Sequence, residues 1–106
     1  MPKYLITASY TAEGVKGLRK DKASGRKAAV TATVEQMGGK LEAMYYAFGH
    51  ADVFAIVEMP DNASIAAFSL AASATGVTRT TTTVLMTIEE ADKALEKTVQ
   101  FRGAGQ

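Results

Sequence analysis

The chain has 106 residues, of which 47% are hydrophobic and 22% charged, and this is the size and composition of one globular domain with a single core. Its formal net charge of +1 argues against a nucleic-acid-binding protein, because the basic cluster Arg19–Lys27 is interrupted by Asp21 and contains no aromatic residue that would stack on bases. The absence of cysteine excludes disulfides and thiolate chemistry.

The N-terminal segment MPKYLITASYT has no charged leader followed by a long apolar core, so we expect no signal peptide. No apolar run approaches the ~20 residues that span a bilayer. We therefore expect a cytoplasmic protein that has no membrane partner, and the lack of cysteine suits a reducing compartment.

The first part of the chain predicts a strand followed by a broken helix. Tyr4–Tyr10 is rich in aromatic and β-branched residues, which favours a strand. Thr11 is a suitable N-cap for a short helix, which the turn-like segment Lys20–Gly25 interrupts. A better helix follows over Gly25–Met37, and Gly38 ends it.

The second part predicts a hairpin, a helix, a strand and a final helix. Leu41–Phe48 and Val53–Met59 are strands whose connection, Gly49 to Asp52, is too short for a crossover, so they pair antiparallel. Asp61 caps a helix that runs to about Thr75, and a threonine-rich strand follows over Val77–Met86. Thr87 and Glu90 form a capping box for a last helix over Ile88–Val99.

This order, β-α-β-β-α-β with an extra C-terminal helix, predicts one α+β domain over residues 1–106. It is the ferredoxin-like arrangement, in which two helices cover one face of a four-stranded antiparallel sheet. Both alternations of the central strands are largely apolar, so the uncovered face predicts an interaction surface. We expect a homodimer in which two sheets pack face to face. The alternative is a monomer whose terminal helix crosses the open face.

Candidate catalytic residues lie near the hairpin connection. His50 is the only histidine, and in an extended segment it points the same way as Asp52. A carboxylate beside an imidazole favours a general base. The alternative is that Asp52 accepts hydrogen bonds from backbone amides in the turn while His50 is an exposed turn residue.

Four other residues are candidates for catalysis or ligand binding. Arg79, among the threonines of the last strand, either binds a carboxylate or carbonyl oxygen or pairs with Glu58 across the sheet. Tyr45 and Tyr46 lie on opposite faces, so at most one of them faces a given cavity. Glu58 in its apolar run is an edge residue, a paired group or a carboxyl with a raised pKa.

The sequence gives little support for a metal or a cofactor. One histidine and no cysteine leave only carboxylates, and these have no metal-ligand spacing. No phosphate-binding glycine motif and no Gly-x-Ser-x-Gly motif is present. We therefore expect neither a nucleotide-dependent enzyme nor a serine nucleophile.

Three stretches of the chain carry a family resemblance. They are YLITASYTAEG, GGKLEAMYYAFGHADVFAIVEMPD and VTRTTTTVLMT. With them the chain resembles the GYD-domain family of small bacterial proteins. At the hairpin the family pattern is Gly, a variable residue, Tyr and Asp. Gly49 and Asp52 match it, whereas Ala51 stands where the tyrosine is usual. This departure weakens any role that needs a phenol in the turn.

The resemblance implies a ferredoxin-like fold related to the dimeric α/β barrels, a group that includes cofactor-free monooxygenases, polyketide cyclases, haem-processing enzymes and ligand-binding regulators. Such breadth does not select one function. We predict a homodimer with an inter-sheet cavity for a small, largely apolar molecule. As an enzyme it would act without cofactor on a carbonyl or phenolic compound, with Asp52 or His50 as base and Arg79 or a tyrosine steadying the oxyanion. The alternative is a non-catalytic structural, assembly or regulatory module.

Overall fold

The computed structural model describes all 106 residues, and its elements follow the predicted order. The bounds are β1 Lys3–Tyr10, α1 Ala12–Gln36, β2 Lys40–Tyr46, β3 Val53–Glu58, α2 Asn62–Ala74, β4 Thr78–Leu85 and α3 Ile88–Glu96. The α+β class and the ferredoxin-like order with an extra C-terminal helix are therefore confirmed. None of the three helices combines the length and the apolar character needed to cross a membrane.

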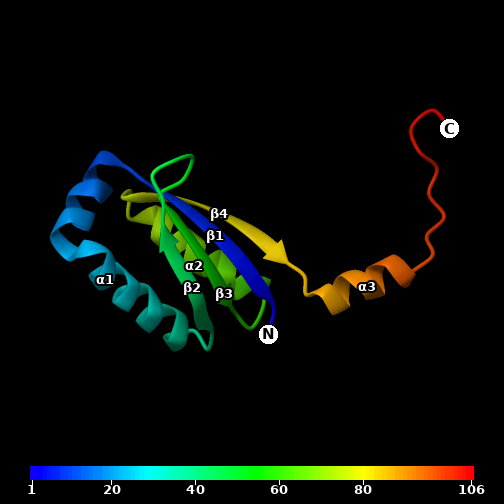
Figure 1. Ribbon diagram of the computed structural model, residues 1–106, viewed down its shortest axis with the longest axis horizontal. Helices are drawn as coiled ribbons and strands as arrows, with labels where there is room; N and C mark the ends of the chain where they lie inside the picture. Colours follow the sequence, from blue (N-terminus) through cyan, green and yellow to red (C-terminus); the bar gives the residue numbers. More distant parts are fainter.

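The sheet has the strand order β2-β3-β1-β4, and every neighbouring pair is antiparallel. β2 and β3 form the predicted hairpin, whereas α1 and α2 each connect strands that are not neighbours. Both helices lie against the same face of the sheet (Figure 1). We call this face, which carries Tyr4, Ile6 and Val57, the covered face. The opposite face, which carries Leu5 and Ile56, is the open face.

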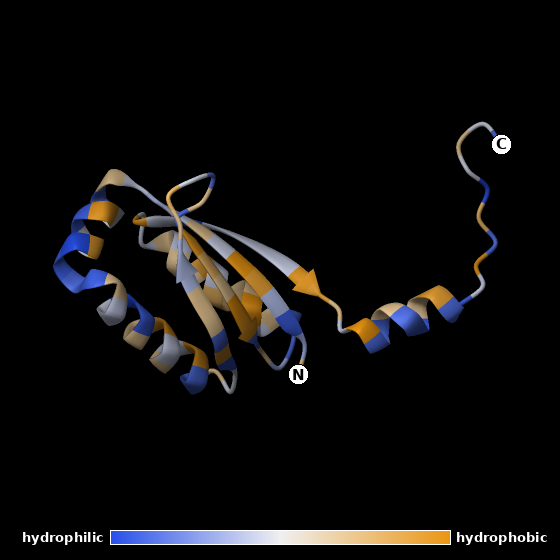
Figure 2. Ribbon diagram, in the orientation of Figure 1, coloured by the Kyte–Doolittle hydropathy of each residue, from blue (hydrophilic) through white to orange (hydrophobic).

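The hydrophobic core lies between the covered face and the two helices. Its buried members are Tyr4, Ile6, Val34, Ala55, Val57, Met59 and Ile65. Tyr4 is fully buried, and its hydroxyl donates a hydrogen bond of 2.6 Å to Asn62 Oδ1, so its one polar group is satisfied. The apolar residues of β1 and β3 run through the middle of the sheet (Figure 2).

Helix α1 contains the interruption that its sequence predicts. Thr11 is the N-cap and accepts a hydrogen bond from the Gly14 amide. Lys22 has φ of 63° and ψ of 167°, which divides α1 into two helical pieces at a kink. The interruption is a single residue, and the second piece begins before the predicted start at Gly25.

Strand β2 differs from the prediction because it contains a bulge. The pairing shifts between Leu41, which lies opposite Val57, and Ala43, which lies opposite Ile56. A bulge inserts one extra residue and so changes which face the following side chains occupy. Leu41 therefore packs against the core, and a simple alternation along the strand had placed it with Ala43 on the other face.

The connection between β2 and β3 is longer than predicted, because β2 ends at Tyr46. Phe48, predicted to lie in the strand, is fully exposed in this loop. Asp52 fixes the end of the loop: its carbonyl accepts from the Ala47 amide at 2.8 Å, and its own amide donates to the Ala8 carbonyl at 2.9 Å.

The threonines of β4 divide between the two faces. Thr80 and Thr82 lie on the covered side, where their hydroxyls are hydrogen-bonded to Ser73 at 3.4 Å and Ser69 at 2.9 Å, respectively. Small hydroxyl side chains of α2 thus join the helix to the strand. Part of the threonine content is therefore explained by helix packing.

Residues 86–106, which we call the C-terminal arm, project away from the rest of the domain (Figure 1). The radius of gyration is 16.8 Å, whereas a compact domain of this length has about 13 Å. Helix α3 has the predicted capping box but no buried residue. The terminal helix therefore does not cross the open face of its own chain, as the monomer alternative required.

Candidate functional site

The principal cavity has a volume of about 490 Å³ and lies between α1, α2 and the covered face. We call it the central cavity. Its floor comes from the middle of the sheet, with Ile6, Ala55 and Val57 among its residues. The expected cavity lay between two sheets, on the open side. That inter-sheet cavity needs a second copy of the chain and stays a prediction.

Small side chains on the helices leave room for this cavity. Ala29 of α1 and Ala67 and Ala71 of α2 line it, and an alanine fills little of the space between a helix and a sheet. Fourteen of the 18 lining residues are hydrophobic. The arrangement suits a molecule whose surface is mostly apolar.

Several polar groups of the central cavity lie at one end, whereas Thr33 lines the cavity farther along α1. Tyr10 and Thr78 lie opposite each other at the β1–β4 pairing, and Arg26 approaches from the second piece of α1. These three residues also line a smaller adjoining cavity of about 220 Å³. The cavity therefore has a polar end beside the start of β4.

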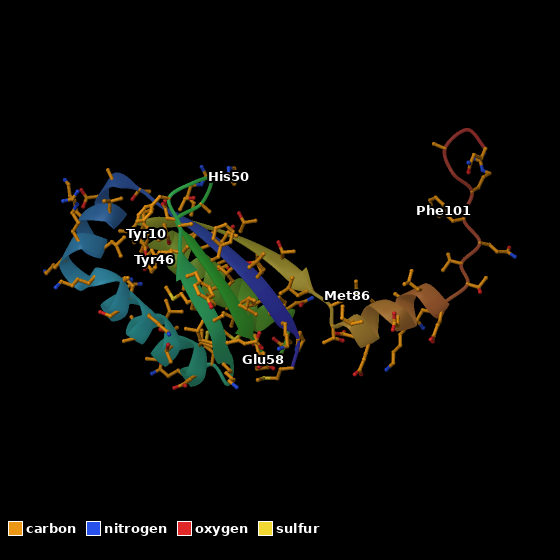
Figure 3. All side chains as sticks on the ribbon, in the orientation of Figure 1. Tyr10, Tyr46, His50, Glu58, Met86 and Phe101 are labelled. Carbon is orange, nitrogen blue, oxygen red and sulfur yellow. The ribbon has the colours of Figure 1, made fainter.

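Tyr10, which lines this polar end, stacks on Tyr46, which lines neither cavity. The rings of Tyr10 and Tyr46 are 6.4 Å apart between centroids and nearly parallel, at 4°. Their hydroxyls are 3.0 Å apart and hydrogen-bonded (Figure 3). Burial, followed by the hydrogen bond with Tyr10, raises the pKa of Tyr46 strongly, although the nearby Arg26 acts in the opposite direction. Tyr46 therefore stays a neutral phenol at physiological pH and serves as a hydrogen-bonding group.

Arg26 is the only charged residue that lines the central cavity. Its Nη1 lies 3.7 Å from Asp21 Oδ2, and the side chain is 37% exposed. The ion pair is longer than an ordinary hydrogen bond, and a guanidinium has five N–H donors. Arg26 therefore keeps donors free for a ligand.

The candidate base residues do not line the central cavity. His50 lies at the tip of the β2–β3 loop and is exposed (Figure 3). The Asp52 carboxylate accepts a hydrogen bond of 2.8 Å from the backbone amide of Tyr10. Asp52 thus bonds a backbone amide, as the structural alternative described, and the amide belongs to β1. A catalytic role for these two residues stays a prediction.

Arg79 and Glu58 do not pair. In the register of β1, Arg79 lies opposite Ser9, and Glu58 lies opposite Lys3. Six residues of extended strand separate these positions, a distance of roughly 20 Å. This alternative is therefore wrong, because the strand order places the two charges at opposite ends of the sheet. Lys3 instead forms an ion pair with Glu42.

Tyr45 and Tyr46 lie on opposite faces, as predicted. Tyr45 lies opposite Phe54 and is 72% exposed on the open face. Tyr46 lies opposite Val53 and is half-buried beside Tyr10. Of the predicted site residues, Tyr46 and Asp52 both contact Tyr10 of the central cavity, Tyr46 through the Tyr10 side chain and Asp52 through the Tyr10 backbone amide.

Arg26 was not among the predicted site residues, because it falls within the basic cluster Arg19–Lys27. The sequence nevertheless contained a signal. Arg26 precedes Val30 by four residues and Thr33 by seven, so it lies on the same face of the helix as these two lining residues. The sequence contains no comparable signal that Tyr10 lines the cavity, because its position depends on contacts with β2 and β4.

Comparison with known proteins gives one finding. The model of the GYD domain matches residues 4–95 of the 106-residue chain. No curated protein and no solved structure gives a significant match. The match includes the sheet, α1, α2 and nearly all of α3, in agreement with the resemblance noted in the sequence. The chain therefore belongs to the GYD-domain family.

Proposed function

We propose that this protein is a homodimer that binds a small, largely apolar molecule in the central cavity. The observation that carries the proposal is the cavity itself. Its volume of about 490 Å³ is within the range of about 300–1,000 Å³ that is usual for small-molecule sites. Its lining also has the usual composition of such sites, mostly apolar with a few polar groups gathered together.

The open face supports the dimeric part of the proposal. Phe54 and Tyr45 are exposed side by side on neighbouring strands, and Leu5 and Ile56 pair beside them. The apolar residues of this face lie mainly on β1, β2 and β3, whereas β4 presents Arg79, Thr81 and Thr83 there. An exposed apolar group with polar neighbours is typical of an interaction surface. A second copy would present the same patch, as a two-fold interface requires.

A more specific form of this proposal is that the protein is an enzyme that acts on the bound molecule. The hydroxyl of Tyr10 and the guanidinium of Arg26 are donors suited to a carbonyl oxygen or a phenolate, the expected substrate classes. No histidine or carboxylate lines the central cavity to act as the base. His50, Asp52 and Arg79 would meet a substrate only at a second site. We therefore propose binding as the primary function.

The experiment that tests the binding function is native mass spectrometry of the freshly purified protein and of Ala55→Leu. Ala55 is buried in the cavity floor, so leucine would extend into the space that the ligand occupies. The matched control is Ala66→Leu, because Ala66 is exposed on α2 and does not line the cavity. Both variants are also titrated with octan-1-ol as an apolar probe.

We expect a dimer that carries extra mass or binds octan-1-ol with a dissociation constant near or below 1 mM. Ala55→Leu should weaken the binding at least tenfold, while Ala66→Leu should leave it unchanged. Equal binding by both variants would place the probe elsewhere and contradict the cavity assignment. A protein that is monomeric at high concentration would contradict the dimer.

A specific observation favours a second function, that of an assembly module. The C-terminal arm presents large apolar residues, Met86, Ile88, Leu95, Val99 and Phe101, which are between 63% and 86% exposed. Figure 3 shows Met86 just beyond the end of β4 and Phe101 far from the sheet, at the two ends of this apolar stretch. An unpacked amphipathic helix of this kind is typical of a segment that binds another chain.

The assembly function is tested by sedimentation of Leu95→Gln against Glu96→Gln. The two residues are neighbours in α3, both are exposed, and both receive the same side chain. If the arm drives association, Leu95→Gln weakens it at least tenfold and Glu96→Gln does not. Identical sedimentation of both variants and of the parent protein would rule out this role for the arm.

A further inference from the structure

The central cavity has an axis, with a charged end and an apolar end. Arg26 stands at the start of the lining stretch of α1 and Met37 at its finish. These residues are eleven apart, which corresponds to roughly 16 Å along a helix. Met37 and Phe68 pack against the core at the far end, where no charged residue lines the cavity. A ligand that fills this space has one end beside Arg26 and an apolar body.

The polar end favours one negative charge. Arg26 repels a cation, whereas its guanidinium and the hydroxyl of Tyr10 both donate hydrogen bonds to an anionic oxygen. Asp21, 3.7 Å from Arg26, holds one negative charge beside the site. This carboxylate repels a doubly charged phosphate about twice as strongly as it repels a single carboxylate, and the fork geometry of arginine matches the two oxygens of a carboxylate.

From this geometry we propose that the ligand is a monocarboxylate with an elongated apolar body, its carboxylate bound by Arg26 and Tyr10. The inference rests on the proposed binding function and adds the chemical class of the ligand. The apolar body lies along Ala29, Val30 and Thr33 toward Met37. Tyr46 positions the Tyr10 hydroxyl through their 3.0 Å hydrogen bond.

The test is calorimetric titration with three probes that share a chain length: octanoate, octan-1-ol and octylamine, at neutral pH. Octanoate should bind the parent protein at least tenfold more tightly than octan-1-ol, and octylamine should bind most weakly. Arg26→Gln should remove the preference for octanoate and leave octan-1-ol binding in place. The matched control is Lys27→Gln, because Lys27 is an exposed neighbour that lines neither cavity.

A second variant keeps the test decisive if Arg26→Gln does not fold. Asp21→Asn removes the carboxylate that competes for Arg26, so octanoate should bind about two- to threefold more tightly, with octan-1-ol unchanged. A merely damaged protein would not gain affinity for one probe alone.

The outcomes separate the ligand class from the binding function. Equal affinities for octanoate and octan-1-ol in the parent protein would overturn the monocarboxylate and leave the cavity a binding site. Failure of all three probes to bind would overturn both. If the probes bind only after Leu95→Gln, the arm of a second copy occupies the cavity, and the monocarboxylate is again overturned.

Discussion

Both faces of the sheet carry tyrosine, but the exposure of its side chain differs greatly between the two faces. Tyr4 on the covered face is fully buried, whereas Tyr45 on the open face is 72% exposed. The side chains are identical, so composition does not decide which of them is buried. The topology does, because both crossover helices lie on one side. Apolar side chains on the face that has no helix over it therefore stay exposed in the single chain.

The strongest test of this contrast replaces one methionine on the covered side and one in the arm. Met59→Ala removes a fully buried side chain and leaves a void in the core. We expect the free energy of unfolding to fall by about 2–5 kcal/mol. Met86→Ala makes the same chemical change at a residue that is 63% exposed, so its effect should stay below about 0.5 kcal/mol. Urea denaturation at low protein concentration measures both.

A substantial loss of stability for Met86→Ala would mean that the arm is packed in solution. Repeating the denaturation at higher protein concentration then identifies the partner. A loss that grows with concentration would come from association with a second copy.

The sequence predicted the elements well but did not predict the central cavity, and the reasons are physical. Helix boundaries depend on local signals such as the Thr11 and Asp61 caps, and both caps form as predicted. The bulge at Leu41 and Ala43 depends on pairing with another strand, so alternation along β2 alone could not reveal it. The central cavity depends on how far the helices stand from the sheet, and no local pattern encodes that distance.

Asp52 shows the same limit within the predicted site. Its position after the loop indicated either a base or a structural acceptor, and the sequence left both open. In the structure the Asp52 carboxylate accepts a hydrogen bond from the backbone amide of Tyr10, 42 residues earlier in the chain. Only the register between strands brings that amide within 2.8 Å.

Substitutions at Gly14 and Gly17 test how closely the start of α1 packs against its neighbours. A Cβ added to Gly14 would meet the Val77 carbonyl oxygen and come within 2.8 Å of the Tyr10 ring. We expect Gly14→Ala to destabilise the fold by about 1–3 kcal/mol through overpacking. A Cβ at Gly17, one turn later, would meet nothing within 4 Å, so Gly17→Ala should stabilise by about 0.5–1 kcal/mol. Thermal unfolding of the two variants should therefore shift in opposite directions. A shared direction would contradict the close contact at Gly14.

Replacing Tyr45 and Tyr46 in turn compares how much each face of the sheet contributes to stability. Tyr46→Phe removes the hydrogen bond with Tyr10 on the covered side and should cost about 1 kcal/mol. Tyr45→Phe changes an exposed side chain on the open face and should have almost no effect in the monomer. Denaturation midpoints at neutral pH measure the difference. Equal midpoints would mean that the Tyr10–Tyr46 bond adds nothing to stability.

The raised pKa of Tyr46 predicts that the stability of the fold depends on pH in the alkaline range. Its pKa is raised in the folded state, mainly by burial, so folding favours the neutral phenol. The stabilisation is complete below the ordinary tyrosine pKa of about 10 and is lost as the pH rises above it. The parent protein should therefore lose stability more steeply than Tyr46→Phe above pH ~10. Parallel pH profiles would contradict the burial of this phenol.

The smallest effect on the global free energy of unfolding is expected for a change in the C-terminal arm, at the N-cap of α3. Thr87 accepts a hydrogen bond of 3.1 Å from the Glu90 amide, and the Glu90 carboxylate accepts one of 3.0 Å from the Thr87 amide. The hydrogen bond from the Thr87 backbone amide is the main cause that lowers the pKa of Glu90, so the cap is fully formed above the ordinary glutamate pKa and weakens as acid protonates the carboxylate. Thr87→Ala should destabilise α3 by about 1 kcal/mol locally.

Because no residue of α3 is buried, this local loss should not reach the rest of the fold. We expect faster amide hydrogen exchange within Ile88–Glu96 and a change of less than about 0.5 kcal/mol in global unfolding. A global loss as large as the local one would show that α3 unfolds together with the sheet. The C-terminal arm would then be packed against an apolar surface, and the open face of a second copy is the surface that this chain leaves uncovered.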